Sequence, residues 1–273
     1  SILTSSNGSW TGRRTWNSPP RKLPDLAHNV RMVIETERLI LDAWQSGDWE
    51  ALRPTDPGRG MLATQIEALR LVGEGLRGDV PFIATVFSPL SMAKHLAGND
   101  VALSHMRQAP DAFHRGLETL TESIIRFIDA ARATGIAGIY YAVQHAAYPL
   151  LSRDEFATFG RPYDRRVLES AGDLWCNMVH LHGRRVMFDL VADYPVPLLN
   201  WHDRETGIAL SDGLGHFPGA ASGGVSQWTL HREDPAGALA EAADARRQTG
   251  DRRSAHAARF ALASSCFGPH SSS

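Results

Sequence analysis

Two histidines stand at the end of a predicted strand, one residue apart. His180 and His182 belong to the stretch "MVHLHG", residues 178–183. Side chains at positions i and i+2 of a strand project from the same face, so both imidazoles can point together. Such a pair can bind a metal ion or transfer protons. Alternatively, one ring packs in the core and the other faces solvent. The spacing alone leaves these alternatives open.

A cysteine follows another predicted strand farther along the chain. Cys266 comes 84 residues after His182. Two imidazoles and one thiolate would make a three-ligand zinc set with a fourth position open for water or substrate. The alternative is that Cys266 is a small buried apolar residue. Cys176 has the same strand parity as the histidines but lies deeper, so we assign it to the core.

Further polar residues are found at the ends of predicted strands. In "NWHDRETG", Asp203 can orient a ligand histidine or act as a general acid–base group, and Arg204 can pair with a substrate carboxylate. The alternative for this pair is a loop ion pair or a helix cap. The residues that we expect to bind substrate are Ser88, Gln144, His145, His202 and Gly224.

Composition and charge exclude several classes of protein. The chain has 273 residues, 43% of them hydrophobic and 21% charged, with a formal net charge of −2. It has no broad basic field for nucleic acid or an anionic membrane, and no apolar run long enough to span a bilayer. Its first residues carry no apolar segment typical of a secretory signal. With two cysteines in all, we expect a cytoplasmic protein. We also expect it to act on a small-molecule substrate.

Strands alternate with helices along most of the chain, which predicts an α/β fold with a parallel sheet. Helices are predicted over residues 60–76, with Leu62, Ile66, Leu69 and Val72 on one face, and over 152–172, with a break at Pro162. Polar residues at the strand ends favour a (β/α)8 TIM-barrel type over a doubly wound sheet. We expect an irregular or disordered tail over 1–28 and a single barrel domain over 29–273. The predicted strands cover residues 81–87, 136–143, 174–181, 196–201, 223–230 and 259–265.

Six strands cannot close an eight-stranded barrel. Two sheet edges would stay open, and open edges favour pairing or aggregation. We therefore expect residues 30–44 to contribute β-structure or a homodimer to cover the opening, and the barrel to be incomplete at its N-terminus.

The ordered motifs resemble the uroporphyrinogen decarboxylase superfamily over roughly residues 48–270. The matching stretches are "DWEALRPTDPGRG", "PFIATVFSPLSMAKHLAG", "HLHG", "DYPVPLLNWHDRETG", "GGVSQ" and "RFALASSCFGP". The sequence departs from the decarboxylases in lacking an R-Q-A-G-R-Y segment and an early aspartate motif. The zinc motif of the related methyltransferases is His-x-Cys-Gly with a later Cys, and here His182 occupies the place of the first Cys.

The resemblance implies two activities. The first is a zinc-dependent methyltransferase with His180, His182 and Cys266 as ligands, which moves a methyl group from a corrinoid or other methyl donor, with a corrinoid protein as a partner, to a thiol. The second is a cofactor-free decarboxylase of tetrapyrroles, in which Arg204 holds a carboxylate and Asp203 stabilises positive charge. A truncated barrel that binds a ligand without catalysis is the third, non-enzymatic reading.

Overall fold

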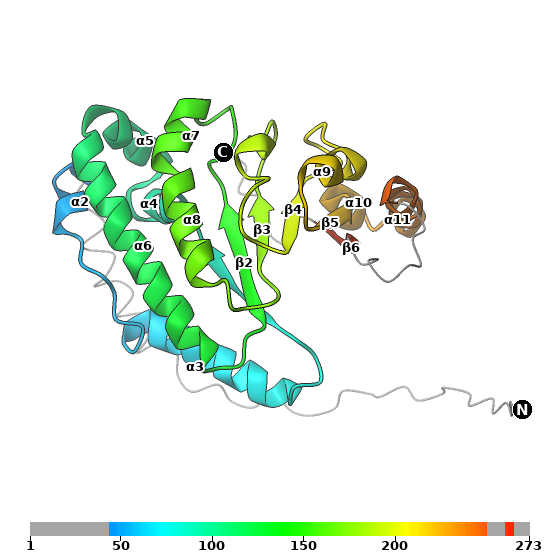
Figure 1. The fold of residues 1–273 in the computed structure, drawn as a ribbon, viewed down its shortest axis with the longest axis horizontal. Helices are drawn as coiled ribbons and strands as arrows, with labels where there is room; N and C mark the ends of the chain where they lie inside the picture. Colours follow the sequence, from blue (N-terminus) through cyan, green and yellow to red (C-terminus); the bar gives the residue numbers. More distant parts are fainter. Residues whose placement is uncertain (1–43, 250–259, 265–273) are drawn as a thin grey trace, which may run out of the picture. The chain divides into compact units, whose positions relative to one another are not determined.

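The computed structural model describes residues 44–249 and the backbone of residues 260–264 (Figure 1). These residues fall within one compact unit, Trp44–Ser273. The predicted tail over 1–28 and the expected β-structure at 30–44 therefore lie outside the described residues, apart from Trp44. Both remain predictions.

Within residues 44–249 and 260–264 the sheet has six parallel strands, arranged side by side in the order in which they follow one another in the chain. This confirms the predicted α/β fold with a parallel sheet, and consecutive parallel strands are the arrangement of a (β/α) barrel. In the described part of the chain β1 and β6 form the two edges of the sheet. The strands are β1 Ile83–Phe87, β2 Gly138–Val143, β3 Met178–Leu181, β4 Leu198–Trp201, β5 Ala220–Val225 and β6 Phe260–Ser264.

Helices α2 and α3 precede β1, and the other helices of the described residues lie in the connections between the strands. The helices are α2 Asp48–Ala51, α3 Gly60–Leu76, α4 Pro89–Ala97, α5 Asn99–Gln108, α6 Pro110–Arg132, α7 Arg153–Phe159, α8 Arg161–Ser170, α9 Leu210–His216, α10 Gln227–His231 and α11 Pro235–Thr249, with a short 3₁₀ helix η1 at Phe188–Leu190. The long helix α6 lies beside α8 on one side of the sheet (Figure 1). It has buried residues at helical spacing, among them Phe113, Leu117, Leu120, Ile124 and Ile128.

Local sequence signals set several helix boundaries. Ser88 caps α4 by accepting a hydrogen bond from the Ser91 backbone N–H, and Pro89 fits the first turn because no helical bond needs its missing N–H. The predicted break near Pro162 is confirmed, since α7 ends before Gly160 and α8 starts at Arg161. On α3, Leu62, Ile66 and Leu69 pack against the core as predicted, whereas Val72, predicted on the same face, is exposed.

Two predicted strands differ from the structure by three or more residues at one or both ends, and the others by at most two. The strand predicted over 223–230 runs instead over Ala220–Val225, and Gln227–His231 is helical. Ser226 accepts a hydrogen bond from the Trp228 backbone N–H and so caps this helix. The strand predicted over 174–181 begins only at Met178. Small residues form the first half of β5, so the usual β-branched signal is missing there.

The two faces of the sheet differ in burial. On β1 the side chains of Ala84 and Val86 are buried beneath the helices, whereas Thr85, which points the other way, is exposed. Residues paired across neighbouring strands share a face. The register pairs Phe87 with Ala142 and Ala142 with His180, so these residues lie on the inner face, opposite the helices.

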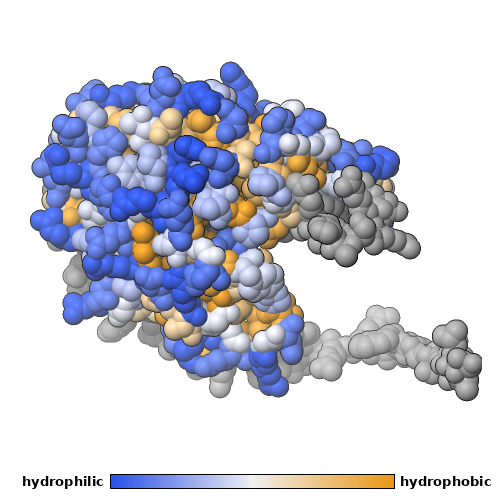
Figure 2. All heavy atoms as spheres, in the orientation of Figure 1, coloured by the Kyte–Doolittle hydropathy of each residue, from blue (hydrophilic) through white to orange (hydrophobic). Residues whose placement is uncertain are grey.

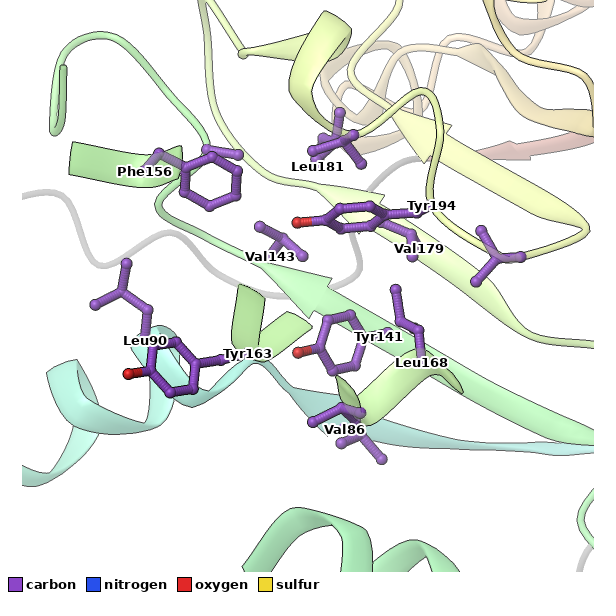
Figure 3. Close-up of a cluster of buried hydrophobic side chains, with 14 of the residues drawn as sticks. Val86, Leu90, Tyr141, Val143, Phe156, Tyr163, Leu168, Val179, Leu181 and Tyr194 are labelled. Carbon is purple, nitrogen blue, oxygen red and sulfur yellow. The ribbon is translucent and has the colours of Figure 1, made fainter. Parts of the chain in front are cut away.

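The helix-covered face contains a buried carboxyl group. The hydroxyls of Tyr141 and Tyr194 donate hydrogen bonds to the two oxygens of Asp164, at 2.8 and 2.9 Å. Figure 3 shows the two tyrosines among Val143, Val179 and Leu168. Burial raises the pKa of Asp164 to about 7, and the two tyrosine hydrogen bonds partly oppose this shift.

Apolar side chains are exposed on α3, at Met61, Leu71 and Val72. Figure 2 shows apolar surface in the lower part of the view, where α3 lies. Within the part of the chain that the structure describes, none of the helices combines the length and the apolar character that crossing a membrane requires.

Candidate metal centre and adjoining pocket

Three histidines meet at the carboxyl ends of β3 and β4. His180 lies on β3, His182 follows that strand, and His202 follows β4. Each offers one ring nitrogen, and these nitrogens all lie within 4.8 Å of one another. The pairing of His180 with Asn200 explains the convergence, because His202 then stands beside His182 on the same inner face. His180 and His202 are buried, and His182 is half-buried.

Asn200 fixes the orientation of His180. Its side-chain N–H₂ donates to the Ser222 carbonyl at 2.6 Å, so its Oδ1 must face His180, whose Nδ1 lies 2.6 Å away. A carbonyl oxygen can only accept, so Nδ1 carries the proton and Nε2 carries the lone pair. A histidine that donates from one nitrogen to a fixed acceptor and presents the other is the usual arrangement of a metal ligand.

The electrostatics around His180 favour its neutral form. Burial, with smaller contributions from His202 and His182, lowers the pKa of His180 to about 3, although the hydrogen bond to Asn200 opposes the shift. The ring of Tyr140 lies nearly parallel to that of His180, with centroids 5.4 Å apart, and covers one of its faces. At neutral pH, His180 can therefore act as a metal ligand without first losing a proton.

The three imidazoles fit a zinc ion. Zinc bound at about 2.0–2.1 Å by tetrahedral nitrogens holds those nitrogens about 3.4 Å apart. The observed limit of 4.8 Å lies within reach of small side-chain rotations. A set of three histidine ligands with a fourth position open is typical of a catalytic zinc site rather than a closed structural one.

The orienting contact between Asn200 and His180 can be tested by mutation. We expect Asn200→Ala to lower zinc affinity about 10- to 100-fold, because loss of the acceptor frees His180 to rotate and to change tautomer. Competition with a chromophoric chelator measures this. Asn99→Ala is the matched control, since Asn99 contacts His145 in another part of the fold. Equal zinc affinities for the two variants would contradict the orienting role of Asn200.

A pocket of about 260 Å³ opens beside the histidines. His182 and His202 form part of its wall, so a bound ligand would contact the same imidazoles. The volume is at the small end for ligand sites, which suits a small molecule. The pocket is lined by His182, Gly183, Arg184, His202, Glu205, Gln227 and Trp228.

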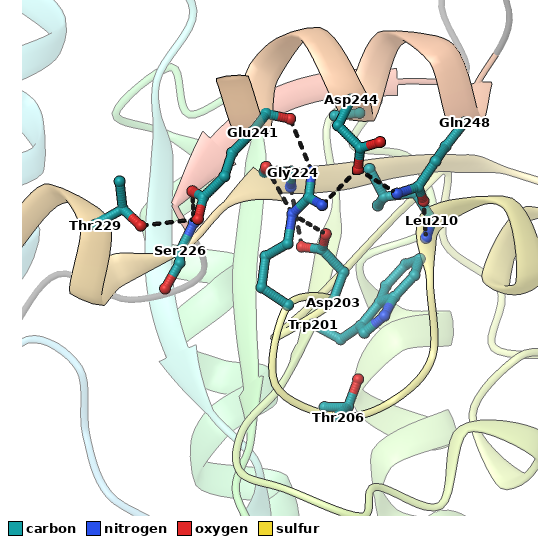
Figure 4. A network of polar contacts seen from close by, with 12 residues as sticks. Trp201, Asp203, Thr206, Leu210, Gly224, Ser226, Thr229, Glu241, Asp244 and Gln248 are labelled. Atoms are coloured by element: carbon teal, nitrogen blue, oxygen red, sulfur yellow. Dashed lines mark hydrogen bonds and ion pairs between the residues drawn. The ribbon is translucent and has the colours of Figure 1, made fainter. Parts of the chain in front are cut away.

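Asp203 and Arg204, predicted to be catalytic, make structural contacts outside this pocket. Arg204 donates to the carbonyls of Gly224 and Glu241 and pairs with Asp244 at 2.6 Å. Asp203 accepts from the Gly224 N–H at 2.9 Å and lies 3.3 Å from the Arg204 guanidinium. Figure 4 shows this network, which joins the end of β4 to β5 and α11. The geometry thus supports the alternative of a loop ion pair over a catalytic role.

Arg204 should therefore matter for stability. Replacing it by methionine removes a shared donor from the Gly224 and Glu241 carbonyls and one of the donors to Asp244. We expect a loss of about 2 kcal/mol in the free energy of unfolding. Arg247→Met is a matched control because Arg247 also pairs with Asp244 but is largely exposed. An exposed pair contributes below about 1 kcal/mol. Urea denaturation of both variants tests the difference, and equal losses would contradict the assignment.

The other residues predicted to bind substrate lie away from the pocket, apart from His202. Ser88 caps α4. Gln144 accepts a bond from Lys94 at 3.4 Å. His145 is buried beside Asn99, and burial lowers its pKa to about 4. Gly224 belongs to the Asp203–Arg204 network and has φ of 101°, a conformation that glycine adopts without strain. Cys266 lies outside the described residues, so its role as a ligand stays a prediction.

Several residues of the site are not predicted from the sequence. Asn200 stands two positions before His202, and this i, i+2 spacing was the available signal for a shared face. Trp228 falls within the strand predicted over 223–230, although Ser226 is a typical helix cap. Arg184 and Glu205 follow their strands closely, but their type alone does not distinguish pocket residues from ordinary loop residues.

Together the fold and the site define an α/β protein of the TIM-barrel type, with a histidine cluster at the carboxyl ends of its strands. The sequence model of the family described as uroporphyrinogen decarboxylase (URO-D) matches residues 38–256. The chain belongs to this family, as the motifs in its sequence indicate.

Individual relatives agree with this assignment. The chain is 29% identical over 154 residues to a uroporphyrinogen decarboxylase of Syntrophotalea carbinolica, covering 54% of this chain and 44% of that protein. It is 29% identical over 108 residues to the enzyme of Xylella fastidiosa, covering 37% and 30% respectively. Among solved structures, a methyltransferase from Methanosarcina mazei has a TM-score of 0.67 at 21% identity, covering 78% of this chain and 64% of that one. The chain thus spans less than half the length of these curated relatives, and the solved structure supports the fold alone.

Proposed function

We propose that this protein is a zinc-dependent methyltransferase of the URO-D family that transfers a methyl group to a small thiol. The observation that carries the proposal is the cluster of His180, His182 and His202, with its nitrogens within 4.8 Å, at the wall of a small pocket. Three neutral imidazoles with an open position suit a site that receives a substrate thiol. The methyl donor would be a corrinoid carried by a partner protein.

The chemistry is a nucleophilic substitution. The thiol loses its proton to solvent water, and its sulfur forms a bond to the methyl carbon. The bond between methyl and donor breaks with the electron pair remaining on the donor. When bound, a zinc ion would lower the pKa of the thiol and hold the thiolate. Three neutral ligands leave the site more positive than a set with cysteine, so the thiol becomes more acidic and the thiolate less nucleophilic.

The residues of this chain would prepare that step. Asn200 holds the protonated Nδ1 of His180, which keeps Nε2 available for the metal. Tyr140 and the buried surroundings of His180 exclude water from that side. Excluding water lowers the effective dielectric constant, which strengthens electrostatic interactions at the open coordination position.

Tetrapyrrole decarboxylation is the second candidate, favoured by the names of the curated relatives. A substrate with several carboxylates calls for several cationic groups around it. Among the described residues that line the pocket, Arg184 is the arginine in that position, while Arg204 is bonded to Gly224, Glu241 and Asp244. This favours methyl transfer over decarboxylation.

Elemental analysis and two assays test the proposal on the full chain. We expect about one zinc per chain. We also expect a thiol-dependent loss of the methylcobalamin absorbance, with a rate that is more than about 100-fold lower in His202→Ala. His216→Ala is the matched control, because His216 is exposed on α9, away from the cluster. Release of CO₂ from uroporphyrinogen by metal-free protein would instead support the decarboxylase. Neither activity, together with no zinc, would leave a non-catalytic barrel.

A further inference from the structure

An oppositely charged pair borders the pocket next to the histidines. Arg184 follows β3 and Glu205 follows β4, so each comes shortly after one of the candidate metal ligands. Arg184 Nε and Glu205 Oε2 lie 3.9 Å apart, and both side chains line the pocket. A small ligand whose far end contacts His182 and His202 would therefore meet both charges with its near end.

Glu205 is held in position, whereas its pairing with Arg184 is loose. The Glu205 backbone N–H donates to the His202 carbonyl at 2.9 Å, and its Oε1 accepts from Gln227 at 3.3 Å. The Glu205 side chain is 17% exposed and that of Arg184 is 73% exposed. A charge-assisted hydrogen bond between such groups normally measures about 2.7–2.9 Å. At 3.9 Å, Glu205 Oε2 and the Arg184 guanidinium can each turn to a charged ligand group.

We propose that this pair recognises the zwitterionic head group of an α-amino acid, which makes the methyl acceptor an amino-acid thiol. The ammonium would pair with Glu205 Oε2 and the carboxylate with Arg184, in the fork geometry that arginine offers. The thiol end would reach His182 and His202, and Trp228 would cover the methylene groups between. The identity of the thiol rests on the proposed function, whereas recognition of the head group does not.

The two charges also discriminate against simpler ligands. A thiol that carries only a carboxylate would bring its negative charge close to Glu205 as well as to Arg184. A thiol that carries only an ammonium would bring its positive charge close to Arg184 as well as to Glu205. Each would leave one protein charge facing a like charge or losing its solvent without compensation. The pocket volume of about 260 Å³ suits a ligand of amino-acid size.

Titration calorimetry on the zinc-loaded full chain tests the recognition with four matched thiols. L-homocysteine carries both charges, 4-mercaptobutanoate lacks the ammonium, 3-aminopropane-1-thiol lacks the carboxylate, and propane-1-thiol lacks both. We expect L-homocysteine to bind at least about tenfold more tightly than each of the others. Glu205→Gln should remove its advantage over 4-mercaptobutanoate, and Arg184→Met its advantage over 3-aminopropane-1-thiol.

Arg185→Met is the matched control, because Arg185 is the exposed neighbour of Arg184 and does not line the pocket. It should leave all four affinities unchanged. Equal binding of the four thiols would overturn head-group recognition while leaving the zinc site intact. Equal effects of Arg184→Met and Arg185→Met would overturn the role of Arg184.

A second titration separates this inference from the proposed function. L-2-aminobutanoate has the head group without the thiol, and it can be titrated into metal-free protein. Binding that weakens about tenfold in both Glu205→Gln and Arg184→Met supports head-group recognition even if the chain binds no zinc, a result that would sink the proposed function alone. Binding that neither variant changes overturns the inference.

Discussion

Replacing His202 by alanine is expected to lower zinc affinity more than about 100-fold, beyond the effect of removing a group that only orients a ligand. The reason is geometric, since His202 offers one of three nitrogens that lie within 4.8 Å of one another. Two imidazoles from β3 alone would leave the ion to water on its other sides. Competition with a chromophoric chelator gives the affinity, and Co²⁺ in place of zinc gives a visible spectrum that reports coordination number.

Two control variants are compared with His202→Ala for zinc affinity. His216→Ala removes an exposed histidine of α9 and should leave affinity unchanged. Cys266→Ser removes the ligand predicted from the sequence motif. A large loss in His202→Ala with a small one in Cys266→Ser makes the three histidines the ligand set. The reverse result would return the site to His180, His182 and Cys266, with His202 as a substrate contact.

Asp164 should make the stability of the protein fall as pH rises from about 4 to 7. The folded protein holds a proton on Asp164 up to a pKa of about 7, whereas the unfolded chain releases it near 3.9. Between these values the unfolded state binds fewer protons, so the free energy of unfolding decreases with rising pH. Three pH units correspond to at most about 4 kcal/mol, and above pH 7 this residue adds no further slope.

Asp164→Asn isolates this contribution. The amide keeps an acceptor for one of the two tyrosines, Tyr141 and Tyr194, and cannot titrate. Urea denaturation at several pH values should show that the unfolding free energy of the wild type falls relative to that of the variant as pH rises from 4 to 7. A difference that stays constant across this range would mean that Asp164 is ionised in the folded protein.

Much of the fold was predictable from local patterns. Helix α3 was predicted over the residues that it occupies, because its apolar spacing and its boundaries agree. The break between α7 and α8 followed from a proline that cannot donate a helical hydrogen bond. Strand β5 was placed three residues too late, because Ala220, Ala221 and Ser222 have little intrinsic strand preference and are strand only by pairing with β4.

The site was predictable in part. Strand parity brought His180 and His182 together, since it depends on one segment alone. That His202 lies beside them depends on the register between β3 and β4, which pairs His180 with Asn200 and which no single segment specifies. For Arg204 the residue type suggested a substrate contact, but its partners Gly224, Glu241 and Asp244 come from segments whose positions only the fold determines.

All three histidines come from one short segment, residues 180–202. The loop between the outer two is brief, so bringing its ends together costs little chain entropy compared with a ligand set gathered from distant parts of the sequence. Metal binding would therefore couple to the assembly of one strand–loop–strand unit rather than to completion of the whole sheet. On this basis the candidate metal centre would need only this unit to form, and not the strands that lie beyond it.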